Sequence, residues 1–396
     1  MDRLIPPARW DEFEGLAELV AALGDGTSRV VGGAVRDTLL GREVTDVDLA
    51  TRLQPEETVA RVKAAGLKAV PTGIKHGTIT AVLASGRPIE VTTLRRDVET
   101  DGRHAVVAFT DDWREDAARR DFTINALYAD VSTGELFDYH GGLDDLAAGR
   151  VRFIGDPYQR IAEDHLRILR YFRFHARFGD ALDEAGLDAC TARANDLMAL
   201  SRERIARELL RLLVAPAAVP VLAIMVERGI LTPVLPEIDA IGVTRLRRVA
   251  EGEAAAGLAP NALRRLAALI PADAAESIGA RLKLSNLDRR MLIQAQPATP
   301  SEPPRALGFR LGVDTAIARL LLAGDDVTDL LGWTPPKLPI TGGALVARGL
   351  DKGPQVAAAL AAVQDQWVAE GFPEEPRVST IADAVVAQAL RSTSKA

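Results

Sequence analysis

The chain has 396 residues, a formal net charge of −7 and a pI near 5.5. Its length allows two to four domains with sizeable cores, and its 47% hydrophobic and 26% charged residues are typical of a globular protein. The acidic balance argues against a protein that coats nucleic acid indiscriminately, while it leaves room for a local basic face that binds one folded RNA.

Cysteine content and hydropathy bear on the cellular location of the protein. The single cysteine, Cys190, excludes an internal disulfide framework and fits a reducing cytosol. The first residues contain no apolar stretch of signal-peptide type. The longest apolar run, Leu212–Met225, includes two prolines and is shorter than the roughly 18 residues that a membrane span needs. We therefore expect a cytoplasmic protein with no membrane partner.

The stretch from Val30 to Thr51 organises the chain. It begins with β-branched residues, turns at Gly32 and Gly33, and continues as a predicted helix, Ala34–Leu40. A Gly-Gly turn that opens a helix offers backbone N–H groups and the positive end of a helix dipole. These groups suit the phosphates of a nucleotide.

A predicted strand, Val44–Leu49, follows this helix. Because strand side chains alternate faces, Asp46 and Asp48 project from the same side. Two adjacent carboxylates repel each other unless a cation lies between them. Mg²⁺ bound through one or two carboxylates and substrate phosphates is the arrangement this pattern suggests. A phosphate cradle and a metal pair in one short segment point to nucleotidyl transfer.

This segment resembles the signature of the DNA polymerase β-like nucleotidyltransferases. More narrowly, it is similar to the bacterial family that unites CCA-adding tRNA nucleotidyltransferases and poly(A) polymerases. The resemblance implies that Gly32, Gly33 and Arg36 hold a triphosphate and that Asp46 and Asp48 hold Mg²⁺.

The flanking sequence predicts a small mixed sheet with helices, and the catalytic carboxylates on one edge. The expected helices are 11–23 and 54–65, and the expected strands are 68–70, 78–83 and 88–93. Glu90 in the last strand is either an exposed strand residue or a third carboxylate of the site. The family resemblance favours the second interpretation.

Residues 95–112 are rich in charged and turn residues and predict a loop or hairpin over the site. The tip, Asp101–His104, resembles the flexible loop that in CCA-adding enzymes helps to switch the site from CTP to ATP. A plain surface hairpin is the alternative.

The segment 116–127 places polar residues among apolar ones. Arg120 could clamp a triphosphate bidentately, which guanidinium geometry suits better than ammonium geometry. The string RRDFTINA resembles the second motif of the family, and Asp121 and Asn125 could position the ribose or brace the arginines.

Residues 161–178 predict one strong helix. Asp164, Arg167, Arg170 and Arg173 recur at steps of three residues and would form one polar stripe. Asp164 accepts hydrogen bonds and Arg167 donates them, so the pair matches the amino group and ring nitrogen of cytosine and of adenine. Uracil and guanine present the opposite pattern. The segment resembles the family motif EDxLRxxRxxRF, to which base selection is assigned. The resemblance implies that Arg170 and Arg173, at the remaining basic positions of the motif, also bind the nucleotide. A solvated arginine face is the alternative.

Beyond this helix the sequence carries less chemistry. Ser201 is expected to cap a helix over 201–213, with Arg204 and Glu208 paired one turn apart. Candidate contacts to the tRNA backbone are Arg245, Arg247, Arg248, Arg264, Arg265, Arg289 and Arg290.

The sequence thus predicts an α+β fold in four parts. These are a nucleotidyltransferase head (1–148), a base-reading helical neck (149–215), a helical body (216–295) and a helical tail that binds tRNA (296–396). The resemblance implies addition of C, C and A to the tRNA 3′ end from CTP and ATP, with Mg²⁺ as cofactor and no DNA partner. A poly(A) polymerase and an enzyme that adds only CC or only A remain alternatives. A non-catalytic RNA-binding relative would be expected to lack one metal carboxylate, and an enzyme that modifies antibiotics would not need the long helical half.

Overall fold

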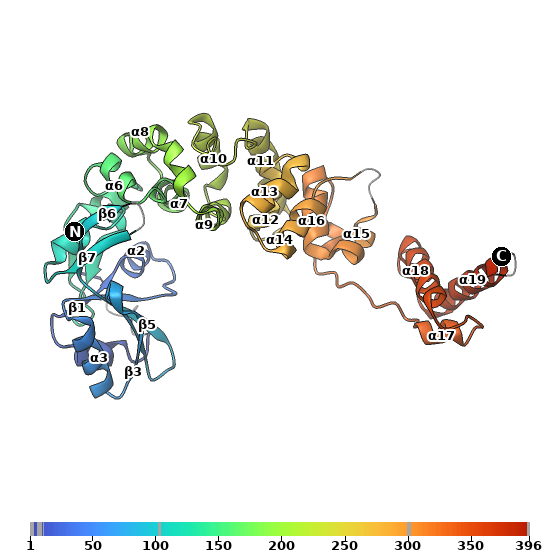
Figure 1. The fold of residues 1–396 in the computed structure, drawn as a ribbon, viewed down its shortest axis with the longest axis horizontal. Coiled ribbons are helices and arrows are strands. Elements are labelled where there is room, and N and C mark those ends of the chain that lie inside the picture. Colours follow the sequence, from blue (N-terminus) through green and yellow to red (C-terminus); the bar gives the residue numbers. More distant parts are fainter. Residues whose placement is uncertain (1–3, 6–9, 11, 102–103, 299–301, 394–396) are drawn as a thin grey trace. The chain divides into compact units, whose positions relative to one another are not determined.

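The computed structural model describes residues 4–5, 10, 12–101, 104–298 and 302–393. The chain divides into two compact units, Met1–Pro236 and Glu237–Ala396. The first unit contains every residue predicted to take part in catalysis, and Figure 1 shows it in blue to yellow-green. The predicted boundary at 215/216 lies inside this unit, so the four-part division remains a prediction.

The first unit is built on a mixed seven-stranded sheet with the order β3-β4-β5-β2-β1-β8-β9. Its strands are β1 (Ser28–Val31), β2 (Asp48–Thr51), β3 (Lys68–Gly73), β4 (Thr78–Val82), β5 (Pro88–Thr93), β8 (Leu127–Ala129) and β9 (Leu136–Asp138). Strands β2 and β5 run parallel, and the other neighbours are antiparallel. The expected α+β head is confirmed, but the carboxylate strands β2 and β5 are interior strands of the sheet.

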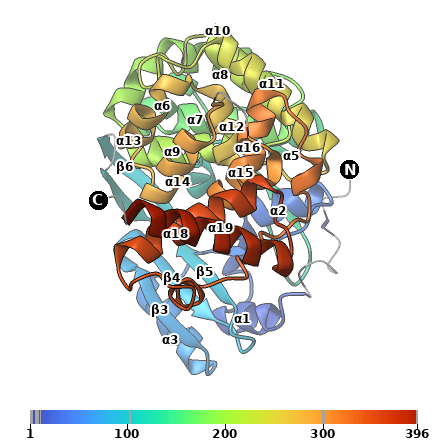
Figure 2. The ribbon, with the colours of Figure 1, turned by 90° about the vertical axis from the view of Figure 1, so that its right-hand side faces the viewer.

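Helices cover the sheet and enclose its core. They are α1 (Leu16–Leu23), α2 (Gly33–Leu39), α3 (Pro55–Ala64), α4 (Trp113–Ala118) and α5 (Gly142–Ala147). Figure 2 shows α3 beside β3 and β4. The core between them includes Leu19, Val35, Leu49, Val62 and Val91, all fully buried. Burial of these side chains holds the β1–α2–β2 segment in place and thereby positions the site.

A separate two-stranded antiparallel hairpin consists of β6 (Arg95–Asp101) and β7 (His104–Phe109). The sequence predicted a loop or hairpin here, and the structure shows the hairpin. Asp101 and His104 are paired in register, whereas Gly102 and Arg103 of the predicted tip lie outside the described residues.

Helices complete the first unit. They are α6 (Pro157–Glu163), α7 (Arg167–Phe178), α8 (Glu184–Ala192), α9 (Arg202–Leu213) and α10 (Ala218–Glu227). Helix α7 packs against α9 and α10. The single helix predicted over 161–178 is wrong, because the chain leaves helical geometry at Asp164, whose φ and ψ are −150° and 105°.

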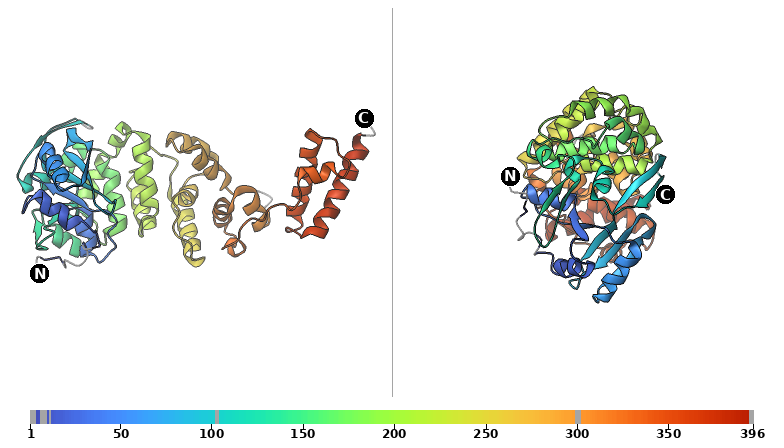
Figure 3. Two further views of the ribbon diagram at one scale, coloured as in Figure 1. Left: turned by 90° about the horizontal axis from the view of Figure 1, so that it is seen from below. Right: turned by 90° about the vertical axis from the view of Figure 1, so that its left-hand side faces the viewer.

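The described residues of the second unit form helices joined by loops, with no strand among them. Its helices are α11 (Ala240–Ala255), α12 (Ala262–Leu269), α13 (Ala275–Arg281), α14 (Asn286–Gln294), α15 (Pro304–Leu311), α16 (Val313–Ala323), α17 (Gly342–Val346), α18 (Pro354–Ala369) and α19 (Glu375–Thr393). Figure 3 shows the last two long helices in red, side by side. No helix among the described residues is both long and apolar enough to cross a membrane.

All seven arginines proposed to contact tRNA belong to this unit, and two of them are buried in it. Arg264 Nη1 and Arg265 Nε donate to the two carboxylate oxygens of Glu253, at 2.9 and 2.7 Å. All three side chains are buried. Because both guanidinium groups are buried against the Glu253 carboxylate, the structure contradicts the expectation that Arg264 and Arg265 contact the tRNA backbone.

Candidate active site

The turn between β1 and α2 requires glycine. Gly32 has φ 71° and ψ −118°, a conformation that side chains other than hydrogen rarely allow. A Cβ atom on Gly32 would lie 3.7 Å from Arg120 Nη1, and one on Gly33 would lie 3.7 Å from Arg36 Nη2. Either Cβ atom would make only ordinary van der Waals contact, so the backbone conformation at Gly32, not the space beside the arginines, requires glycine.

The predicted alternation of the carboxylate strand is present, although β2 begins only at Asp48. Val47 and Leu49 are buried, whereas Asp46 and Asp48 lie on the solvent-accessible side. Asp48 is directly opposite Glu90 in the parallel pairing of β2 with β5. The structure thus brings Glu90 beside the predicted pair, although its participation stays a prediction.

Electrostatics at Asp48 fit a cation site. Partial burial raises the pKa of its carboxyl, and repulsion by Glu90 and Asp46 raises it further, while Arg120 opposes the shift. The Asp48 and Glu90 carboxylates form no ion pair with any described residue. Among the residues the structure describes, no three Asp, Glu, His or Cys side chains converge as a complete metal site. The carboxylates could supply part of the coordination sphere of a metal ion, and the phosphates of a substrate could supply the rest.

A pocket of about 560 Å³ joins these elements. Six arginines and three aspartates line it, together with the glycine turn, Asn125 and Phe174. The charged residues are Arg36, Arg95, Arg119, Arg120, Arg167, Arg170, Asp48, Asp121 and Asp164. The excess of positive charge suits a triphosphate. Arg95 and Phe174 were not singled out from the sequence, because nothing in the local pattern ties a hairpin arginine or a helix phenylalanine to this pocket.

Arg120 is held in place by a buried carboxylate. Asp116 Oδ2 accepts from Arg120 Nη2 at 3.1 Å and from the Tyr128 hydroxyl at 2.7 Å, and Asp116 Oδ1 accepts from Arg119 Nε at 2.9 Å. Although burial acts in the opposite sense, Arg120 and Arg119 lower the pKa of Asp116 to about 2. Sequence reasoning missed Asp116, yet its spacing of three and four residues from Arg119 and Arg120, which follow α4 directly, is the signal that could have identified it.

We expect Asp116→Ala to destabilise the protein by about 3–5 kcal/mol, because it leaves two guanidinium groups without their buried partner. The carboxyl has a lowered folded-state pKa, so its contribution is present above pH 4 and is lost as the pH falls toward 2. Urea unfolding of the variant at neutral pH measures the loss. The exposed neighbour Asp111 provides the control Asp111→Ala; equal stability of the two variants would contradict this role of Asp116.

Asp121 and Asn125 brace the arginines. Asp121 Oδ2 accepts from Arg170 Nε at 2.8 Å, and Asp121 Oδ1 accepts from Asn125 Nδ2 at 3.1 Å. Asn125 Oδ1 in turn accepts from Arg36 Nη1. One chain of hydrogen bonds therefore connects α2, beside the glycine turn, with α7. Of the two roles expected for this pair, the structure displays the bracing one.

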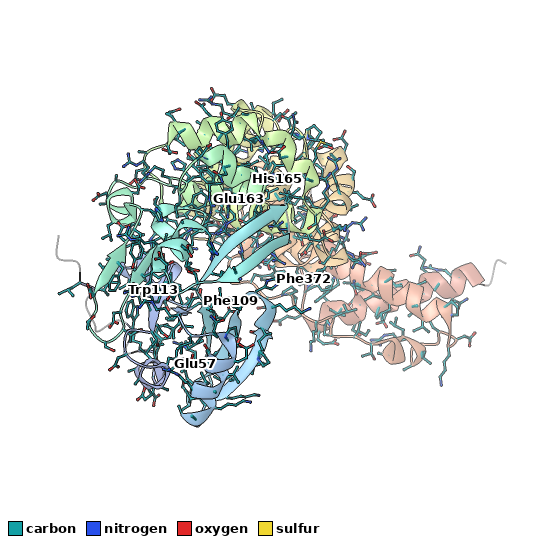
Figure 4. All side chains as sticks on the ribbon, turned by 60° about the vertical axis from the view of Figure 1, so that its left-hand side comes forward. Glu57, Phe109, Trp113, Glu163, His165 and Phe372 are labelled. Atoms are coloured by element: carbon teal, nitrogen blue, oxygen red, sulfur yellow. The ribbon has the colours of Figure 1, made fainter. Side chains whose placement is uncertain are left out.

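The break between α6 and α7 places Asp164 in the pocket. Figure 4 labels Glu163 and His165, the residues on either side of it. Asp164 Oδ1 accepts from the backbone N–H of Leu166 at 3.1 Å, a local bond that competes with helix continuation. Arg204 Nη2 lies 3.0 Å from both carboxylate oxygens. Asp164 and Arg167 share one pocket, but they do not lie on one continuous helix face.

Arg167 is partly engaged. Its Nη1 donates to the Arg160 carbonyl at 2.8 Å and to Glu163 Oε2 at 2.5 Å, and its Nη2 donates to the Arg119 carbonyl at 3.2 Å. Three of the five guanidinium N–H groups are used among the described residues. The Nε–H group and one Nη2–H group remain for a ligand.

The ion pair expected within α9 is absent. Arg204 pairs with Asp164 instead, and Glu208 Oε2 accepts from Arg173 Nε at 2.5 Å. Ser201 occupies the cap position of α9 without a side-chain cap bond. The sequence spacing suggested a pair inside the helix, but both side chains reach partners outside α9. Arg173 does not line the nucleotide pocket; its assignment to nucleotide binding stays a prediction.

Comparison with known proteins decides the family. Residues 28–152 match a model described as poly A polymerase head domain, and residues 181–241 match one described as probable RNA and SrmB-binding site of polymerase A. The chain is 36% identical over 369 residues to the mitochondrial CCA tRNA nucleotidyltransferase 1 of Mus musculus, covering 88% of this chain and 84% of the relative. The chain belongs to the CCA tRNA nucleotidyltransferase family.

Further similarities agree with this family. A CCA-adding enzyme of Streptococcus gordonii is 43% identical over 212 residues, which cover 53% of this chain and 51% of the relative. The crystal structure of the Bacillus stearothermophilus CCA-adding enzyme in complex with CTP has a TM-score of 0.77 and 27% identity, and covers 98% of this chain and 99% of that one. The family is one of metal-dependent nucleotidyltransferases, and in this chain the two glycines, three aspartates and six arginines line one pocket.

Proposed function

We propose that the protein adds C, C and A to the 3′ end of tRNA, using CTP and ATP and releasing diphosphate. The observation that carries the proposal is the single pocket that joins a glycine turn, Asp48, a set of arginines, and the Asp164–Arg167 pair. The first three groups suit a triphosphate with a metal ion, and the last suits a base. The family and its tRNA nucleotidyltransferase relatives support the same activity.

Asp46 and Asp48, with Glu90 beside them, would hold Mg²⁺. When bound, this ion supplies activation of the 3′-hydroxyl and neutralises charge on the triphosphate. Carboxylate ligands and an open side toward the substrate suit Mg²⁺, which retains waters and substrate phosphates in its coordination sphere.

Gly32, Gly33, Arg36 and Arg120 orient the triphosphate in this proposal. Asp116 and Asn125 hold the two guanidinium groups beside the glycine turn before the substrate arrives. A pre-organised arrangement avoids the cost of ordering flexible arginines at the moment of binding.

Asp164 and Arg167 select the base. The Asp164 carboxylate accepts from the amino group of cytosine or adenine, and the free N–H groups of Arg167 donate to the adjacent ring nitrogen. With uracil or guanine, both contacts become repulsive or stay unmade. Each buried polar group left unpaired costs about 1–3 kcal/mol. One pair of side chains could therefore select CTP and ATP without a nucleic-acid template.

We propose a cytoplasmic location, because a chain with one cysteine has no internal disulfide framework and fits a reducing compartment. The mitochondrial location in the name of the Mus musculus relative belongs to that protein.

The proposal is tested on tRNA that lacks its terminal CCA. Purified protein is incubated with this RNA, Mg²⁺, and CTP alone, ATP alone or both, and the products are resolved on a sequencing gel. We expect growth by two nucleotides with CTP and by three with both. A long A ladder with ATP alone would instead identify a poly(A) polymerase, and a stop after two nucleotides with both would identify a CC-adding enzyme.

A further inference from the structure

A second arginine-rich pocket lies in the first unit. It has a volume of about 550 Å³ and is lined by Arg42, Arg173, Arg177, Arg211 and the segment 214–216. It shares no lining residue with the nucleotide pocket. Arg42 follows α2, Arg173 and Arg177 belong to α7, and Arg211 belongs to α9, so three elements distant in sequence supply its charge.

The charges of this pocket are poorly compensated. Glu208 neutralises Arg173, but the guanidinium groups of Arg42, Arg177 and Arg211 form no ion pair with any described residue. Arg42 Nη2 donates to the Arg177 carbonyl at 3.3 Å, a contact that draws the two arginines together without offsetting their charge. Arg177 and Arg211 are exposed and could reach a ligand.

Cations also converge on one ring beside this pocket. The guanidinium carbons of Arg36, Arg42 and Arg177 lie 4.1, 4.7 and 5.3 Å from the centre of the Phe178 ring. The ring face attracts each cation, but the cations repel one another. Burial lowers the pKa of Arg36, and Arg177 contributes to the same shift despite the opposing effect of Asp37. An anion in the neighbouring pocket would relieve this repulsion.

The arrangement of α7 links the two pockets. Arg167 and Arg170 line the nucleotide pocket, and Arg173 and Arg177 line the second one. From Arg167 to Arg177 the helix rises by about 15 Å, so the arginines extend away from the site of nucleotide addition. A chain of phosphates, unlike a single small anion, can contact both ends of such a row.

We propose that the pocket formed by Arg42, Arg177 and Arg211 binds backbone phosphates of the tRNA acceptor strand whose 3′ end lies in the nucleotide pocket. This proposal rests on the proposed function and adds residues that hold the RNA. Arg211 and residues 214–216 lie within 181–241, the segment that matches the model of a probable RNA-binding site. Contacts to phosphates set the register of the strand without reading its bases.

The test is tRNA binding by the double variant Arg177→Glu/Arg211→Glu of the full chain, with RNA that lacks its CCA end, at several salt concentrations. Loss of two phosphate contacts should weaken binding at least about tenfold at 0.1 M salt. It should also reduce the slope of log affinity against log salt by about 1.4–1.8. Lys63→Glu in the exposed part of α3 is the control, and Arg211→Ala is a milder second variant.

Two further measurements separate this proposal from others. Affinity for CTP and the rate of nucleotide addition at saturating RNA should stay within about twofold of wild type. An unchanged salt slope in the folded variants would overturn the proposal. The proposal would also be overturned if the variant bound tRNA normally and differed from wild type only in weaker inhibition of nucleotide addition by inorganic diphosphate, because the pocket would then bind a small anion. If wild type adds no nucleotide to tRNA but the salt slope still falls in the variant, the proposed function fails and the RNA site stands.

Discussion

Replacement of Asp48 by asparagine is expected to reduce nucleotide addition at least about 1,000-fold without destabilising the fold. The activity falls because an amide carries no charge for the metal ion that phosphoryl transfer requires. The free energy of unfolding should stay the same or increase, because partial burial and the nearby Glu90 and Asp46 raise the pKa of the Asp48 carboxyl. A group with a raised carboxyl pKa is less favourable in its charged form, so its removal relieves repulsion at neutral pH.

A loss of activity without a loss of stability distinguishes a residue of the active site from a residue that supports the fold. Single-turnover rates on tRNA and thermal unfolding of the same preparation measure both. Asp25→Asn, at an exposed turn position, is the matched control and should change neither. A variant Asp48→Asn that retains more than a tenth of wild-type activity would refute the metal role, and so would a loss of activity that merely follows a loss of stability.

Replacement of Asp164 by alanine is expected to reduce discrimination against UTP and GTP by about 10- to 100-fold while some metal-dependent turnover remains. The carboxylate is the acceptor for the base amino group, and each lost discriminating contact corresponds to about 1–3 kcal/mol. Competition between CTP and UTP on tRNA that lacks its CCA end measures the ratio. Arg204→Ala should shift selectivity in the same direction by less, because Arg204 orients the carboxylate without touching the base.

Asp188→Ala is the control for this experiment. Asp188 lies on α8 with a mostly exposed side chain, 3.6 Å from Arg228 Nη1, and its removal should leave selectivity unchanged. Wild-type selectivity in the Asp164→Ala protein would reject the assignment of base selection to Asp164, even if the overall rate of addition fell.

Local patterns predicted much of the fold. The alternation of Asp46, Val47, Asp48 and Leu49 indicated correctly which side chains face the core, because strand periodicity is set by the backbone itself. The same reasoning missed β8 and β9, each only three residues long. The pairing of β8 with β1 is a long-range contact that no local window contains, and β9 joins the sheet only by pairing with β8.

For the site, too, local motifs could be predicted from the sequence and long-range contacts could not. The motif resemblance placed Gly33, Arg36, Asp48 and Arg120 in one pocket, as observed. It did not identify Arg204, because the bond from α9 to Asp164 spans 40 residues. The helix over 161–178 was predicted as continuous because its apolar and charged residues recur with helical spacing. The bond from Asp164 to the Leu166 N–H, which accompanies the break, does not alter that periodicity.

In the proposed function, one pocket selects C and A in sequence without a template. The most direct test is to supply the purified protein with tRNA lacking CCA, Mg²⁺ and equal concentrations of all four nucleoside triphosphates, and to sequence the product ends. We expect products that end in CCA and grow no further. Incorporated U or G at a level near that of C would contradict base selection by Asp164 and Arg167, and a run of A without C would contradict CCA addition.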